Sequence, residues 1–352
     1  MDRNKLQSIG CRDNSAAEAA RRRWDGIAKP LGSLGALEDI IVKIAELTGT
    51  PEVRLIKRAV LVLCADNGVV REGVSQSDPG VTMLVAENLT KKMTSVCRMA
   101  AVANADVIPV DMGMASLPGF SGLIDRRTGP GTGNIFKEPA MTVAQAEKAI
   151  DAGISLVEDC KNKGYSIIAT GEMGIANTTT SSAMASVLLG VPVTEVTGRG
   201  AGLSDASLLH KIEVIETAIA VNKPDHADAV DVLSKLGGFD IAGMTGIFIG
   251  GAVHGVPILI DGFISSVAAL TASLICPGAK NAMLASHVSG EPAGKMMLEK
   301  LELSPLITAG MRLGEGTGAV SALPLLDMAL AVYHGSSSFS DIGMEAYEHW
   351  EV

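Results

Sequence analysis

Glycine and hydroxyl side chains are concentrated in residues 171–182, which read GEMGIANTTTSS. Glycine lets the backbone approach a ligand closely, and Asn177 with the Thr/Ser run after it is typical of a helix N-terminus, where amide groups bind anions. The number of hydroxyl groups favours a phosphate-binding site over an ordinary capped helix. Glu172 would repel a phosphate, so we expect it to act as a base or to bind a ribose hydroxyl.

A second glycine-rich segment, TGRGAG, occupies residues 197–202. Its alternating glycines are similar to a dinucleotide-binding fingerprint, but no strong strand precedes it and the third glycine is misplaced for GxGxxG. Two interpretations stay equally open at this point. The segment is either a flexible loop or a backbone nest for phosphate, with Arg199 adding positive charge.

A third segment, RLGEGTG at residues 312–318, places Glu315 between two glycines. Alone, this pattern favours a solvated turn. An apolar helix is predicted directly after it, over residues 319–333, and this helix would hold the loop against packed elements. A partly buried Glu315 would then have a raised pKa and could serve as a general base.

Short apolar runs predict buried strands at residues 59–65, 107–110, 166–170, 257–260 and 282–286. Helices are predicted over residues 15–27, 36–48, 144–163, 178–189, 208–221, 263–275 and 319–333. This alternation predicts an α/β fold with a parallel sheet flanked by helices, whose ligands bind at the carboxyl ends of the strands. The polar turns at Asp66 and Asp111 follow two of these strands, and each is either a plain turn or a wall of the site.

Composition excludes several classes of protein. The formal net charge of -10 over 352 residues argues against a nucleic-acid-binding protein, which needs a basic surface. Five cysteines without a CxxC pair indicate reduced thiols in the cytoplasm, with no zinc site or disulfide framework. His254 and His287 are isolated and typical of hydrogen-bonded core residues, so we expect no metal. Polar residues 1–7 predict no signal peptide, and the interrupted apolar stretch 241–275 predicts a buried helix–strand–helix and no membrane span. The 39 glycines and 3% aromatic residues favour close-packed helices.

Taken in order, these segments resemble the nicotinate-nucleotide:dimethylbenzimidazole phosphoribosyltransferase family. No single stretch decides the resemblance, but the ordered set is specific and runs from residue 29 to about 333. The stretches are KPLGSLGALE (29–38), ADNGV (65–69), GVS (73–75), VT (81–82), DMG (111–113), GEMGIANTTT (171–180), TGRG (197–200), GGFDIAGM (237–244), DGF (261–263), SH (286–287), EP (291–292) and RLGEGTG (312–318).

The resemblance implies a Rossmann-like α/β domain over residues 36–333 and a small helical domain formed by residues 1–35 and 334–352. It implies transfer of phosphoribose from nicotinate mononucleotide to an aromatic acceptor, with inversion at the anomeric carbon. The products are an α-riboside 5′-phosphate, used for the lower ligand of cobamides in cobalamin biosynthesis, and nicotinate. No cofactor is expected, because nicotinate leaves as a neutral ring. A homodimer, or a heterodimer with a paralogous subunit, is implied as well.

The resemblance also implies roles for particular residues. Glu315 matches the general base, and Glu172 matches a second carboxylate in the site. Phosphate and ribose contacts are implied for Gly174, Ala176, Asn177, Thr178, Gly200, Gly202, Ser289 and Gly290. Acceptor contacts are implied for Ser75, Ser77, Pro79 and Leu313.

Two departures from the family's pattern bear on the acceptor. Pro79 stands where the family has a glutamine that contacts the base, so a phenolic acceptor is an alternative to a benzimidazole. Residues 293–295 read AGK where GHR is commoner. Two further hypotheses are a non-catalytic or co-catalytic subunit of a heteromeric enzyme and a nucleotide-binding regulatory protein. Retention of both Glu172 and Glu315 argues against a silent subunit.

Overall fold

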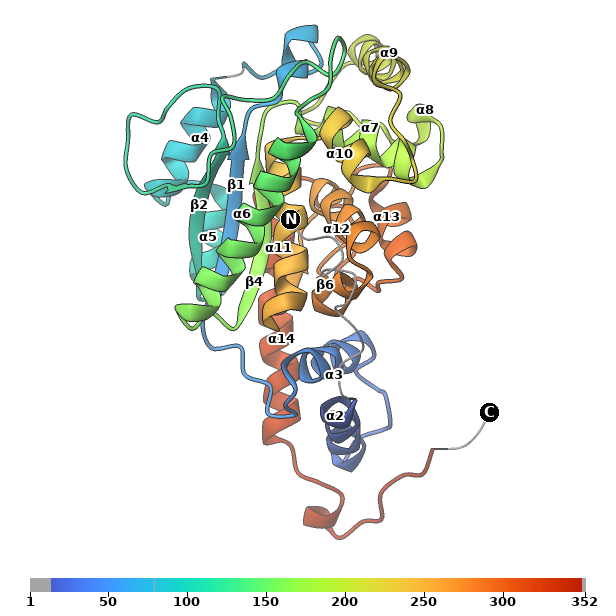
Figure 1. Cartoon of the computed structure of the whole chain (residues 1–352). Coiled ribbons are helices and arrows are strands. Elements are labelled where there is room, and N and C mark those ends of the chain that lie inside the picture. The colour runs from blue at the N-terminus through green and yellow to red at the C-terminus, as the bar shows by residue number, and fades with distance from the viewer. Residues whose placement is uncertain (1–13, 79, 350–352) are drawn as a thin grey trace.

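The chain forms one six-stranded parallel sheet with the strand order β3-β2-β1-β4-β5-β6. The computed structural model describes residues 14–78 and 80–349 (Figure 1). The strands are β1 (Arg58–Ala65), β2 (Ala105–Gly113), β3 (Ile124–Asp125), β4 (Ile167–Met173), β5 (Ile258–Ile260) and β6 (Met283–Ala285). The chain reverses its direction across the sheet between β1 and β4, as in the Rossmann fold. The predicted α/β class is therefore confirmed.

Helices cover both faces of the sheet (Figure 1). Leu61 and Leu63 of β1 face one core, and Val60 and Val62 face the other, which is the alternation expected of a strand buried on both sides. The first core is formed with α6 (Val143–Asn162), α7 (Asn177–Leu189), α8 (Val193–Val196), α9 (Asp205–Asn222), α10 (Ala229–Leu236), α11 (Phe239–His254), α12 (Phe263–Ile275), η2 (Pro277–Ala282) and α13 (Gly294–Leu301). The second is formed with α2 (Ser15–Gly26), α3 (Ala36–Thr48), α4 (Val81–Thr90), α5 (Ser95–Val102) and α14 (Thr317–Gly335).

Glycine allows α6 and α11 to pack backbone against backbone. A Cβ atom added to Gly246 would overlap the carbonyl oxygen of Ile150, and one added to Gly153 would overlap that of Gly243. Neither carbonyl can move without disturbing its helix. The glycine content of the chain thus serves the close helix packing that the composition predicted.

The N-terminal helices lie beside the far end of α14, below the sheet in Figure 1. The Trp24 and Tyr333 rings lie 4.9 Å apart, and Ile27 forms an antiparallel bridge with Ser338. Segments from the two ends of the chain therefore pack together. The division into domains at residues 35 and 334 stays a prediction, and α3 packs directly against α2.

All the predicted strands and helices are present, with boundaries that differ by a few residues. β4 continues to Met173, beyond the predicted end at residue 170. The first helix of the helix–strand–helix predicted over residues 241–275 is α11. The predictions omitted α4, α5, α8, α10 and α13, as well as β3 and the short 3-10 helices η1 (Gly68–Glu72), η2 and η3 (Ser340–Ile342). Among the described residues, no helix is both long and apolar enough to cross a membrane.

Candidate active site

A cavity of about 290 Å³ opens at the carboxyl ends of β4, β5 and β6. Its wall combines the loop after β4, the start of α7, the turns after β5 and β6, and the loop before α14. A second cavity of about 560 Å³ adjoins it and shares Gly200, Ala201, Glu291 and Arg312 with it. Open α/β sheets bind ligands at this edge, next to the point where the strand order reverses.

Most of the site residues implied by the resemblance come together here. The first cavity is lined by Ser75, Glu172, Gly174, Ala176, Asn177, Thr178, Gly200, Ser289, Leu313 and Glu315. Gly202 and Gly290 line the second cavity. Ser77 lines neither of them, and its amide donates to Ser75 Oγ at 3.2 Å. Pro79 lies outside the described residues.

Glu315 is held in a left-handed backbone conformation, with φ of 59°. Such a conformation is strained for a residue with a side chain and is common at functional sites. Its Oε2 atom is buried and has no hydrogen-bond partner. Burial raises the pKa of Glu315, the negative charge of Asp261 raises it further, and the Val96 amide acts in the opposite direction. A buried carboxylate with one free oxygen is well suited to accept a proton.

Glu172 approaches the loop that carries Glu315. A Cβ atom added to Gly314, which has a φ of 86°, would lie 2.5 Å from Glu172 Oε1. Glu172 Oε2 accepts a hydrogen bond from Asn177 Nδ2. Burial raises the pKa of Glu172 to about 8, with a further rise from Asp240, and the Asn177 hydrogen bond opposes the shift.

The start of α7 differs from the expected capped helix. Ala176 is the N-cap residue, with φ of 72°, and Asn177 is the first residue of the helix. The Asn177 side chain makes no capping bond, because it bridges the carboxylates of Glu172 and Asp240. The helix N-terminus still lines the cavity, through Thr178 among others.

Lys211 supplies the buried positive charge at this end of the site. Its Nζ atom lies 2.9 Å from Thr178 Oγ1 and 3.3 Å from the Gly198 carbonyl oxygen. The residue is 1% exposed, and burial lowers its pKa to about 8, against the influence of Glu291. Sequence reasoning missed Lys211. It lies on the face of α9 that buries Val214, Ile215 and Ala218, and a lysine on an apolar face was the available signal.

Arg199 lines the second cavity but not the first. Its guanidinium donates to the Leu203 carbonyl oxygen at 2.8 Å and pairs with Asp205 at the start of α9. These bonds tie the side chain to its own loop and satisfy part of its charge there. In the loop itself, Gly200 and Gly202 both have positive φ, as in a backbone nest.

Asp261 fixes the start of α14 and so positions the loop that carries Glu315. Its carboxylate accepts hydrogen bonds from Gly316 N at 3.1 Å and from Ala319 N at 3.0 Å. His287 lies beside it, with Nδ1 3.0 Å from Ser286 Oγ, as expected of a hydrogen-bonded core histidine. Burial lowers the pKa of His287, so the ring is neutral near pH 7.

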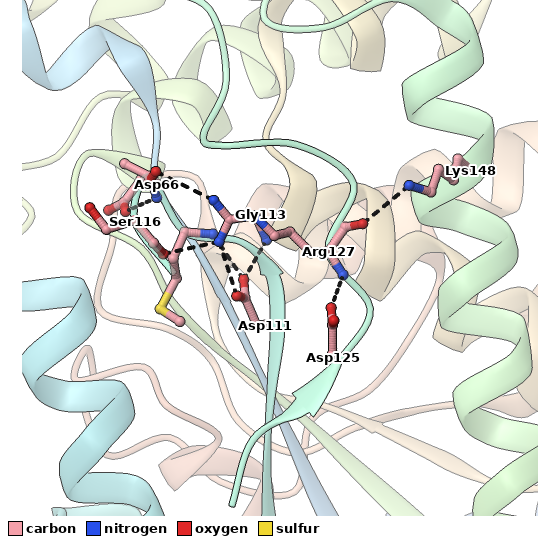
Figure 2. A network of polar contacts seen from close by, with 9 residues as sticks. Asp66, Asp111, Gly113, Ser116, Asp125, Arg127 and Lys148 are labelled. Atoms are coloured by element: carbon pink, nitrogen blue, oxygen red, sulfur yellow. Dashed lines mark hydrogen bonds and ion pairs between the residues drawn. The ribbon is translucent and has the colours of Figure 1, made fainter. Parts of the chain in front are cut away.

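The turns after β1 and β2 serve the scaffold. Figure 2 shows Arg127 between Asp111 and the segment that follows β2. Asp111 Oδ1 accepts from Gly113 N and Met114 N, both at 2.9 Å, and Asp66 Oδ2 accepts from Ala115 N at 2.7 Å. Neither aspartate lines either cavity. Of the two interpretations, the structure favours plain turns, which here anchor the long segment between β2 and α6.

Residues 9–344 match the model of a family described as Phosphoribosyltransferase. Two proteins named nicotinate-nucleotide–dimethylbenzimidazole phosphoribosyltransferase are each 46% identical to the chain. The one from Ruminiclostridium cellulolyticum aligns over 95% of both chains, and the one from Acetivibrio thermocellus over 97% of this chain and 98% of its own. The chain belongs to this phosphoribosyltransferase family. The fold of CobT from Thermus thermophilus is similar, with a TM-score of 0.88 and 36% identity over 94% of this chain and 99% of that one.

Within residues 14–78 and 80–349, no group of three or more His, Cys, Asp or Glu side chains is placed to hold a metal ion. The phosphoribosyltransferase site combines the carboxyl groups of Glu172 and Glu315, the amides and hydroxyls at the start of α7, and the buried Lys211, which lies near Glu291. Such a mixture of charges suits a donor with a cationic ring and an anionic phosphate.

Proposed function

We propose that the chain transfers phosphoribose from nicotinate mononucleotide to an aromatic acceptor, which provides the lower ligand of cobamides. The observation that carries this proposal is the buried Glu315 with its unpartnered Oε2, which lines one cavity together with Glu172 and the N-terminus of α7. Relatives that match nearly the whole chain are named for this transfer.

The donor would bind with its phosphate toward the start of α7. Amides in the first turn of a helix attract anions, and Lys211 adds a charge directly behind Thr178. Ser289 and Gly200 line the wall between this end and the carboxylates, where the ribose would lie. This orientation brings the anomeric carbon near Glu172 and Glu315.

The transfer would break the bond between the anomeric carbon and the pyridinium nitrogen. The bonding electron pair returns to that nitrogen, so nicotinate leaves as a neutral ring. An ionised Glu172 would stabilise the positive charge that develops on the ribose. The unprotonated ring nitrogen of the benzimidazole attacks from the opposite face, and the proton on its other ring nitrogen passes to Glu315, a step worth roughly 10²–10⁴-fold in rate.

A benzimidazole is the acceptor that we propose, with a phenolic ring as the second candidate. Leu313 is 58% exposed at the mouth of the cavity, and a flat apolar ring would cover it. Gln76, next to Ser75, donates a hydrogen bond to the Gly202 carbonyl oxygen. This bond joins the segment at residues 75–77, for which acceptor contacts are implied, to the glycine-rich segment 197–202. The names of the relatives support the benzimidazole.

Nicotinate release tests the proposed reaction. The purified chain is incubated with nicotinate mononucleotide and, separately, dimethylbenzimidazole, adenine, phenol or p-cresol, and products are analysed by chromatography and mass. We expect Glu315→Gln to lower turnover by at least about a hundredfold with an unchanged unfolding temperature. Glu299→Gln, at an exposed position on α13, is the matched control. Near-wild-type turnover of Glu315→Gln would exclude Glu315 as the base. Failure to release nicotinate with any of the four acceptors would contradict the transfer.

We further propose that the enzyme acts as a dimer in the cytoplasm. The resemblance to the family supports a dimer, of identical or of paralogous subunits. The scattered cysteines support a reducing compartment, and Cys64, Cys97, Cys160 and Cys276 are buried. Sedimentation of the purified chain would show a dimer if the subunits are identical and a monomer if a paralogue is required.

A further inference from the structure

One amide nitrogen joins two buried carboxyl groups behind the cavity. Asn177 Nδ2 donates to Glu172 Oε2 and, at 3.0 Å, to Asp240 Oδ2. Glu172 lines the cavity, whereas Asp240 does not. Asp240 therefore acts on the site only through its neighbours.

Asp240 is fully buried at the start of α11, with 0% exposure. Its Oδ1 atom has no hydrogen-bond partner, and neither do the side-chain atoms of Asn67, which is 1% exposed. A Cβ atom added to Gly174 would lie 3.0 Å from Asp240 Oδ2 and 3.1 Å from Asn67 Nδ2, so the two side chains lie close together. Hydrogen bonds from the amides of Asp240 and Ile241 lower the pKa of the aspartate, but burial outweighs them and raises it to about 6.

The charged groups around the pair are acidic. Asp261 at the end of β5 and Glu315 before α14 act on Glu172, and Asp66 at the end of β1 acts on Asp240. Two neutral groups complete the surroundings. Burial and the nearby carboxylates raise the pKa of the Cys64 thiol on β1, and burial lowers that of His287 after β6. Two negative charges that share one amide donor in such a place repel each other strongly, so the pair retains a proton.

We propose that the negative charge of Asp240, held beside Glu172 by the shared Asn177 amide, keeps Glu172 protonated in the empty site, and that binding of the cationic donor releases this proton. Asp240 is thus a positioning residue, and the inference rests on the proposed function. While the site is empty, no positive group in the described part of the chain compensates a negative charge on Glu172, so the neutral form of its carboxyl group is favoured. The positive pyridinium and ribose of the donor favour the carboxylate, so Glu172 is ionised when the oxocarbenium develops. The proton passes to solvent through the cavity, and no other bond changes.

Proton release on binding tests the proposal in the intact enzyme. Calorimetry in buffers of different ionisation enthalpy, at pH 7 and without acceptor, gives the number of protons released with nicotinate mononucleotide. Inorganic phosphate is the control ligand, because it would occupy the proposed phosphate end at the start of α7 without bringing a cationic ring. We expect release approaching one proton per site with the mononucleotide and much less with phosphate.

Three variants assign the proton. Glu172→Gln should release equal numbers of protons with nicotinate mononucleotide and with phosphate. Asp240→Asn, which keeps the shape but removes the charge, should bind the mononucleotide and release measurably fewer protons than the wild type, because the part of the Glu172 pKa shift that Asp240 causes is lost. Asp240→Ser removes the same charge with a smaller side chain and replaces Asp240→Asn if that variant does not fold.

Infrared spectra of the wild type give an independent measurement. The empty enzyme should show a protonated-carboxyl band that disappears with the mononucleotide and is missing from Glu172→Gln. Equal proton release by the wild type and Glu172→Gln, or an undiminished count in both Asp240 variants, would overturn the inference. If the mononucleotide binds and is turned over without proton release, only this inference fails. If it does not bind, the proposed function fails first.

Discussion

Replacing Glu172 with glutamine should make the ligand-free protein less sensitive to alkaline pH. Burial raises the pKa of Glu172 from 4.5 to about 8, so the folded protein holds this proton where the unfolded chain has lost it. The contribution of Glu172 to the free energy of unfolding is then most favourable below about pH 4.5, where this carboxyl group is protonated in both states. It falls as the pH rises toward 8, because the folded state binds more protons over this interval.

The size of the effect follows from the same interval. One pKa unit corresponds to about 1.4 kcal/mol, so the rise from 4.5 to about 8 costs up to about 5 kcal/mol at alkaline pH. Glutamine has no such titration and can keep the contact with Asn177 through its amide oxygen. We therefore expect Glu172→Gln to gain stability relative to the wild type between pH 5 and pH 8.

Urea unfolding at pH 5, 6, 7 and 8, monitored by circular dichroism, measures this gain. The difference between variant and wild type isolates Glu172, because the other titrating groups are common to both proteins. Glu299→Gln, on the surface of α13, should show no trend with pH. A difference between Glu172→Gln and wild type that stays constant from pH 5 to pH 8 would refute the reasoning.

Three further predictions concern the phosphate end, the core and the acceptor. Lys211→Met should weaken binding of nicotinate mononucleotide by about 10–100-fold in calorimetry, the scale of a lost charged hydrogen bond, and Arg199→Met, whose guanidinium is tied to its own loop, should change it less than about threefold. Equal losses would contradict the assignment of the phosphate charge. Gly246→Ala should lower the free energy of unfolding by about 1–3 kcal/mol or more, because its methyl group meets the Ile150 backbone, whereas Gly26→Ala has open space and should change it by less than about 1 kcal/mol. Similar unfolding midpoints for the two alanine variants would count against backbone contact as the cause. Pro79→Gln should shift the acceptor preference toward benzimidazoles in competition assays, and an unchanged product ratio would remove this loop as a specificity element.

The sequence predicted the framework of the fold because its signals are local. Apolar runs such as residues 59–65 and helical spacing such as residues 36–48 depend only on near neighbours in the chain. The helices α4, α5 and α10 were missed because they have only 10, 8 and 8 residues, and helices this short depend on tertiary packing for their stability. The predicted set of helices that flank the sheet was therefore incomplete.

Order along the chain also carried information about the site. The glycine-rich segments around Glu172 and Glu315 predicted that these two carboxylates approach a ligand. Both residues line the first cavity. The segment around Arg199 predicted a positive charge, and the structure adds the buried Lys211, which sequence reasoning missed. Local sequence shows that a side chain is present, but it does not show whether its charge is satisfied by a neighbour such as Asp205.

The sequence by itself therefore determined the α/β class, the order of the functional loops and the family to which the chain belongs. Only the tertiary structure decided which charges are buried together. Asp240 and Glu172 are 68 positions apart in the sequence, and a single Asn177 amide joins them because α7 and α11 begin at the same edge of the sheet. The cost of burying a charge depends on the surrounding dielectric and on charges brought near by folding, so the protonation of such a pair has no signature in the linear chain.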